Sequence, residues 1–215
     1  MKRILALCAL IAVLAVPALS NAAQGLYISP KIMLSVYNTG TVSQDGLSGY
    51  GIGQQGQSTF AGAVAAGYDF YPQQGLPLRT ELEVALRTNA SESWSGNRGK
   101  VEGTWNSTTT FLNFYWDFHN ATAFTPYVGA GLGMAFQYAG YDVKNGANKY
   151  SMDDRYTTFA WNAGVGLAYA VNENLAVDLG YRFVGMSQHD ISQNNTKVET
   201  NPYMNEFSLG ARFMF

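Results

Sequence analysis

The sequence predicts an all-β fold: an eight-stranded antiparallel up-and-down transmembrane β-barrel. Three observations predict it. Apolar and polar residues alternate in eight segments of the chain, which is the period of a β-strand. No Asp, Glu, Lys or Arg occupies the apolar phase of any of these segments. The last segment runs to the end of the chain, which finishes on the aromatic residue Phe215.

Each segment has one phase of large apolar residues and a second phase of charged, small or amide residues. The apolar phases take every second position from Leu26 to Val36, Phe60 to Phe70, Leu78 to Leu86, Leu112 to Phe118, Val128 to Phe136, Phe159 to Tyr169, Leu175 to Phe183 and Phe207 to Phe215. In water, a face without charge would expose a very large apolar patch. In a bilayer that face is required, because a Lys or Arg at the midplane would cost about 2–4 kcal/mol. We therefore predict that the apolar phase faces lipid and that the polar phase faces the lumen.

The connections between the segments alternate in length. Short turns are predicted near 72–77, 120–125 and 172–174, and long outer loops near 39–57, 92–105, 139–156 and 188–202. An even number of strands puts both termini on one side, so the short turns are expected in the periplasm and the long loops outside the cell. Aromatic residues at the turn ends are expected to form a periplasmic girdle: Tyr68, Phe70, Trp116, Phe118, Tyr127 and Tyr169. The last strand should pair with the first, because lipid offers no hydrogen-bond partner to a free sheet edge.

The N-terminus has the pattern of an export signal. Lys2 and Arg3 precede an apolar run that is too short to span a bilayer comfortably, and Ser20-Asn21-Ala22 supplies a small-x-small cleavage pattern. We predict a cleaved signal peptide over 1–22 and a barrel domain over 23–215. A lipoprotein signal is the weaker interpretation, because the apolar run continues past Cys8. Cleavage would leave 11 basic residues against 15 acidic residues, a balance that argues against nucleic-acid binding.

Several runs then resemble one family. They are Asn113-Phe114-Tyr115-Trp116-Asp117-Phe118, the PYVGAGLG run over 126–133, Gly180-Tyr181-Arg182-Phe183, and Leu209-Gly210-Ala211-Arg212-Phe213-Met214-Phe215. They resemble the opacity-protein-like small outer-membrane barrels, which are akin to the transmembrane domain of outer-membrane protein A. The resemblance extends from about Gly25 to Phe215. It implies the outer membrane of a Gram-negative bacterium, with lipid and lipopolysaccharide as surroundings. It also implies a C-terminal assembly signal, carried by Phe213 and Phe215, for the barrel-assembly machinery.

The polar phases bring many charged residues into the predicted lumen. They are Lys31, Asp69, Arg79, Glu81, Glu83, Arg87, Asp117, Asp178, Arg182, Glu206 and Arg212. Side chains fill the interior of an eight-stranded barrel, and an unpaired buried charge is very costly. The charges are therefore predicted to form a structural plug of ion pairs; the alternative is an ion path or a gate. The sequence gives no metal or cofactor motif.

Three classes of function remain open. Because the resembling family includes adhesins and surface antigens, the first is a non-enzymatic surface protein whose outer loops contact host surfaces, other cells or the envelope. The second is a lipid A acyl hydrolase that uses His189 with Ser187 or Ser192, although the His-x-Ser-Asn run of such enzymes is replaced here by His189-Asp190-Ile191-Ser192. The third is a soluble periplasmic carrier, which would need an apolar lumen that this sequence does not provide.

Overall fold

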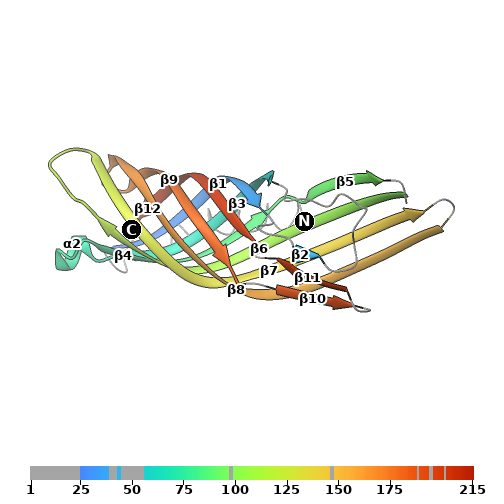
Figure 1. Cartoon of the computed structure of the whole chain (residues 1–215). Helices are drawn as coiled ribbons and strands as arrows, with labels where there is room; N and C mark the ends of the chain where they lie inside the picture. Colours follow the sequence, from blue (N-terminus) through green and yellow to red (C-terminus); the bar gives the residue numbers. More distant parts are fainter. Residues whose placement is uncertain are drawn as a thin grey trace.

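Alternating residues form eight long strands that follow one another around a closed barrel in the computed structural model (Figure 1). The strands are β1 (Leu26–Asn38), β3 (Gly56–Asp69), β4 (Leu78–Arg87), β6 (Gly99–Asp117), β7 (Phe124–Asn145), β8 (Asn148–Asn172), β9 (Leu175–Met186) and β12 (Tyr203–Met214). The structure describes residues 25–38, 43–44, 56–96, 99–145, 148–187, 189–193, 196–200 and 202–215, without the side chains at the outer ends of several strands. The predicted signal segment 1–22 lies outside this description.

The barrel closes where the last strand meets the first, as predicted. Ile32 of β1 pairs with Leu209 of β12. We call the eight long strands of the barrel its staves. Their order around the barrel is β1-β3-β4-β6-β7-β8-β9-β12, and every neighbouring pair is antiparallel. Every stave therefore has a ladder partner on both sides, which removes the free edges that lipid cannot satisfy. No helix in the described part of the chain is long and apolar enough to cross a membrane.

One proline interrupts the seam between β1 and β12. The ladder has register pairs at Ile28↔Phe213 and at Lys31↔Gly210, and none between them. The Phe215 N–H donates to the Leu26 carbonyl at 3.0 Å, so Leu26 and Phe215 are a hydrogen-bonded pair of this antiparallel ladder. Hydrogen-bonded pairs recur at every second position, which places Pro30 and Ala211 at another such position. Proline has no N–H, and the Ala211 carbonyl therefore lacks its ladder donor.

The three predicted short turns lie together at one end of the barrel. The first contains α2 (Tyr71–Gln74), which ends at Gly75 with a left-handed φ of 63°. The other two follow β6 and β8. Each holds an Asn whose Oδ1 accepts a backbone N–H two residues on: Asn120 from Thr122 at 2.8 Å, and Asn172 from Asn174 at 2.9 Å.

The opposite end differs from the prediction, because two of the expected loops are β-structure. The strand β5 (Ala90–Gly96) pairs with β6 up to Gly96↔Gly99, and β7 pairs with β8 up to Asn145↔Asn148. The predicted loops at 92–105 and 139–156 are therefore wrong over most of their length. We call this region (90–96, 99–107, 137–145 and 148–156) the outer extension, which projects beyond the barrel in Figure 1. Short strands β2 (Ser43–Gln44), β10 (His189–Gln193) and β11 (Thr196–Thr200) form a separate small sheet from the other two predicted loops; most of 39–57 lies outside the described residues.

The faces of the wall have the predicted orientation. On β4, Leu82 is 56% exposed, whereas Arg79 and Glu83 are 3% and 1% exposed. Trp116, Phe118 and Tyr169 are exposed on the outer surface at the turn end, as expected for the girdle. Tyr127 was expected there and lies inside instead, with its ring centroid 5.1 Å from Arg79 Cζ. It occupies the polar phase of its strand, opposite Asp117, so its position in the alternation decides its side.

Candidate functional site: the charged lumen

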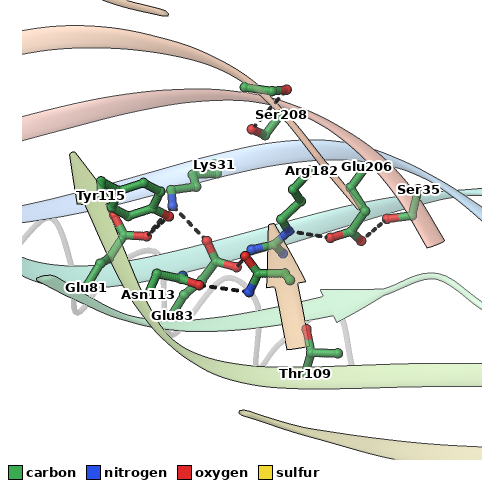
Figure 2. A network of polar contacts seen from close by, with 12 residues as sticks. Lys31, Ser35, Glu81, Glu83, Thr109, Asn113, Tyr115, Arg182, Glu206 and Ser208 are labelled. Carbon is green, nitrogen blue, oxygen red and sulfur yellow. Dashed lines mark hydrogen bonds and ion pairs between the residues drawn. The ribbon is translucent and has the colours of Figure 1, made fainter. Parts of the chain in front are cut away.

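The centre of the lumen holds a chain of alternating charges that links four strands (Figure 2). Its members are Glu81, Lys31, Glu83, Arg182, Glu206 and Arg87, in order of contact. The five successive ion pairs have N···O distances of 2.5, 2.7, 2.7, 2.7 and 2.6 Å. Each cation except the last lies between two carboxylates, and Glu83 and Glu206 each lie between two cations. The arrangement neutralises charges that burial alone would make very costly.

The chain connects strands that are not neighbours in the sheet. Glu83 on β4 and Arg182 on β9 belong to opposite staves, since three staves separate β4 from β9 in either direction around the barrel. Lys31 on β1 reaches Glu81 and Glu83 across β3, where its register partner is Ala63. The small residues of β3 therefore leave the space through which Lys31 passes.

Two further ion pairs lie toward the turn end. Asp117 accepts hydrogen bonds from Arg79 Nε and Nη2 at 2.5 and 3.0 Å, and the guanidinium lies 4.8 Å from the Tyr115 ring centroid. Arg212 donates to Asp178 through Nη2 at 2.9 Å and Nε at 3.3 Å. Such two-point contacts fix both the distance and the plane of the guanidinium.

The structure therefore brings together ten of the eleven charged residues predicted for the lumen. The exception is Asp69, which is buried and stands opposite Arg79 in the ladder but forms no ion pair with any of the described cations. Its Oδ1 accepts the backbone N–H of Tyr71 at 2.9 Å, at the entrance of the first turn. Asp69 thus contacts the start of α2, away from the ion-pair chain.

Part of the lumen is apolar, in contrast to the polar lumen predicted from the sequence. Phe111, Ala135, Ala160, Val184, Met186 and Met204 form one buried cluster. Phe111 lies 5.2 Å from Arg182 Cζ, so the cluster adjoins the charged chain. The signal was present in the sequence: Phe111 precedes Leu112, an outward position, and strict alternation assigns Phe111 to the interior.

Glycines make room for large rings in the wall. A Cβ at Gly67 would clash with the ring of Tyr27, and a Cβ at Gly166 would clash with the ring of Tyr127. The space left beside the charged chain is a cavity of about 40 Å³ that borders Lys31, Glu81 and Arg182. Such a volume holds on the order of one to three water molecules. Arg182 borders this cavity, and its buried Nη2 has no protein hydrogen-bond partner and is a suitable ligand for such water.

The residues of the enzymatic alternative lie at the outer end. His189 and Ser192 lie on β10, where their register partners on β11 are Thr200 and Lys197. The structure does not describe the side chains of His189 and Ser192. Ser187 is exposed just after β9, and its backbone N–H donates to the Phe159 carbonyl at 2.9 Å. The described residues contain no group of three or more His, Cys, Asp and Glu side chains able to hold a metal ion.

The two C-terminal aromatics of the predicted assembly signal belong to the seam. Phe213 is 37% exposed on the outer face and pairs with Ile28 on one side and with Leu175 on the other. Phe215 follows directly on β12 and makes the backbone bond to Leu26 described above.

Comparison with known proteins places the chain in a family. Residues 6–215 match the outer membrane protein β-barrel domain. The chain belongs to this family. It is 32% identical to the outer membrane protein PagN of Salmonella typhimurium over 240 residues, covering all of both chains. The family and this relative indicate the outer membrane of a Gram-negative bacterium.

Two solved structures share the fold. Neisserial surface protein A aligns with a TM-score of 0.53 at 19% identity, over 89% of this chain and 97% of its own. The outer membrane protease OmpT of Escherichia coli aligns with a TM-score of 0.51 at 7% identity, over 89% of this chain and 97% of its own. At these identities the likeness shows the architecture alone, and the presence of a protease illustrates that the fold does not fix the function.

Proposed function

We propose that this outer-membrane protein is a non-enzymatic surface protein that uses its outer extension for adhesion or for contacts within the envelope. The length of that extension is the observation that carries the proposal. The β7–β8 ladder continues for nine register positions, from Gln137↔Tyr156 to Asn145↔Asn148. At about 3.4 Å per residue this adds roughly 25–30 Å of paired sheet beyond the last lipid-facing aromatics.

The extension is suited to contacts in water. On its outward face, the described side chains are polar at Ser91, Thr104, Ser151 and Asp153, whereas the same face of the barrel below is apolar. In the described part of the chain, β8 pairs on both sides only up to Ala160 and on one side beyond it. A sheet with an open edge and a polar face can accept a strand or a surface from a partner.

The test is to shorten the extension without opening the barrel. Gly140 and Asp153 are register partners, so residues 141–152 can be replaced by a two-residue Asn-Gly turn that keeps the ladder below. We expect binding to cells to fall while the barrel still folds in detergent. The matched control replaces Gln73 and Gln74 of α2 with alanine, at the opposite end, and should bind as the parent does. Unchanged binding after removal of the extension and of the β10–β11 hairpin would contradict the proposal.

The lumen is proposed to be a plug. The support is the Glu83–Arg182 ion pair, which links opposite staves, and the small volume that remains beside it. A hydrated ion would have to break this pair to pass. We expect planar-bilayer recordings of purified protein to show no large unitary currents, and the Glu83→Ala/Arg182→Ala variant to raise the leak. Large, stable currents from the parent protein would favour the ion path instead.

Three further roles are proposals from the sequence. The segment 1–22 would direct export, and Phe213 with Phe215 would present the last strand to the barrel-assembly machinery; Phe215→Ala should then slow assembly in cells more than in purified lipid. The acyl-hydrolase alternative has no support from the described side chains. It would be established by release of fatty acid from lipopolysaccharide that disappears in His189→Ala.

A further inference from the structure

The outside of the wall carries one Lys or Arg side chain that the structure describes, Arg155 on β8. The other described Lys and Arg side chains lie in the lumen: Lys31, Arg79, Arg87, Arg182 and Arg212. Arg155 is exposed, and its Cζ lies 5.5 Å from the ring centroid of Tyr138 on β7. Among the described residues it forms no ion pair. The guanidinium is thus held on an aromatic ring and is available to an anion from outside the protein.

Its height places Arg155 in the headgroup layer of the membrane. Phe136 and Phe159 are the last lipid-facing aromatics on their strands and are 46% and 52% exposed. Arg155 is four residues beyond Phe159, and its register partner Tyr138 is two residues beyond Phe136. With a rise of about 3.4 Å and a tilt of about 40°, these steps correspond to roughly 10 and 5 Å of height. The polar layer of a leaflet is about 5–8 Å thick, and a long Arg side chain can bend toward it.

The neighbouring groups suit a phosphorylated sugar. Asn106 on β6 is the register partner of Tyr138 on the other side. Its Nδ2 donates to Asn89 Oδ1 at 3.0 Å and to the Arg87 carbonyl at 2.8 Å, which leaves Asn106 Oδ1 as an acceptor. This row therefore offers a cation, a phenol and an amide oxygen side by side. The cation can neutralise a phosphate ester on a sugar, and the hydroxyl groups of the sugar can form hydrogen bonds with the phenol and the amide oxygen.

We infer that Arg155, supported by Tyr138, binds a phosphate group on the sugar headgroup of an outer-leaflet glycolipid. The guanidinium suits this role better than an ammonium, because it can contact two phosphate oxygens at once while stacking on a ring. Asp153 lies on the same face one step further out, where Gly140 is its register partner. The Asp153 carboxylate would repel an anion bound at Arg155. Neutralising Asp153 should therefore strengthen binding, whereas neutralising Arg155 should weaken it.

The experiment measures glycolipid binding by the folded protein in detergent. Bisphosphorylated lipid A, its dephosphorylated form and inorganic phosphate are titrated against the parent and against Arg155→Gln, Arg155→Lys, Asp153→Asn and Glu173→Gln. Glu173 is an exposed residue in the third periplasmic turn, at the opposite end, and serves as the charge-change control. Both Arg155 and Asp153 are exposed, so the variants should fold; heat-dependent mobility on gels checks this.

We expect Arg155→Gln to weaken binding of the phosphorylated lipid about tenfold, Arg155→Lys to weaken it less, and Asp153→Asn to tighten it. Binding of the dephosphorylated lipid should be weak and indifferent to Arg155. Equal affinity of parent and Arg155→Gln for the phosphorylated lipid would overturn the inference, as would equal affinity of the parent for both lipids. Displacement of the lipid by an equimolar amount of inorganic phosphate would show a free-anion site and overturn the assignment to a headgroup.

Discussion

Glu206 is the position at which the buried charge network can be tested most sharply. Its side chain is fully buried, and its carboxylate accepts hydrogen bonds from Ser35 at 2.5 Å, from Arg87 at 2.9 and 2.6 Å, and from Arg182 at 2.7 Å. Glu206→Gln keeps the shape and removes the charge. Arg182 retains Glu83, but Arg87 would keep only neutral acceptors: the new side-chain amide oxygen, the Ser107 carbonyl at 3.3 Å and the Thr109 hydroxyl at 3.1 Å.

The expected cost follows from the loss of the counter-charge of Arg87. Removing one partner of a buried ion pair costs about 3–5 kcal/mol, and the lower end applies here because Arg87 retains three neutral acceptors. We therefore expect the free energy of unfolding to fall by about 3 kcal/mol. With a denaturant slope of 1–3 kcal/mol per molar, the urea midpoint in lipid vesicles should drop by about 1–3 M.

Two variants control this prediction. Glu173→Gln removes the same charge from an exposed turn and should change stability by less than about 0.5 kcal/mol. Arg87→Met/Glu206→Gln removes the cation together with its counter-charge and should recover at least half of the loss. A Glu206→Gln protein as stable as the parent, or a double variant whose loss is the sum of the two single losses, would refute the reasoning.

Three further outcomes are expected from single substitutions in the wall. Leu132→Arg introduces a charge at a lipid-facing position that is 59% exposed, and should lower stability in bilayers by about 2–4 kcal/mol, measured by urea titration. Gly166→Ala should cost about 1–3 kcal/mol in the same titration, because the new methyl group meets the Tyr127 ring, and Tyr127→Leu in the same chain should reduce that cost. Pro30→Val should raise stability by about 0.5–1.5 kcal/mol, since it restores an N–H donor opposite the Ala211 carbonyl, and hydrogen exchange should slow at the new amide.

The orientation of the barrel wall was predictable because alternate residues of each strand face two different environments, the lipid and the lumen. Lipid excludes charge from one phase, and the narrow lumen must pair the charges of the other. Arg79 and Leu82 on β4 are therefore assigned to opposite sides by position alone. The partners of each charge were not predictable, since the Glu83–Arg182 pair depends on which staves face each other across the lumen.

The outer extension was not predicted because its strands lie beyond the lipid, and only lipid-facing strands need the alternation of apolar and polar residues on which the prediction rested. Beyond Phe136 the outward phase turns polar, and the contrast between the two faces, on which the strand assignment rested, disappears. Local evidence remained: Asn145-Gly146 has the composition of a tight hairpin turn, and Val101, Thr104 and Trp105 favour strands. A search for hairpins in the loops, independent of amphipathicity, would have found β7 and β8 at full length.

The same change of polarity along the outward face defines where the membrane ends. On β8 the outward residues pass from Trp161 and Phe159, through Thr157, to Arg155 and Asp153. Every step is two residues, so hydrocarbon, headgroup and water are met in turn by one strand that never changes its pairing with β7. The rigid ladder fixes the height of Arg155 relative to the lipid-facing rings, and this makes its phosphate contact a matter of geometry. A flexible loop with the same residues would not fix this height, because its basic side chain could lie at any depth or in open water.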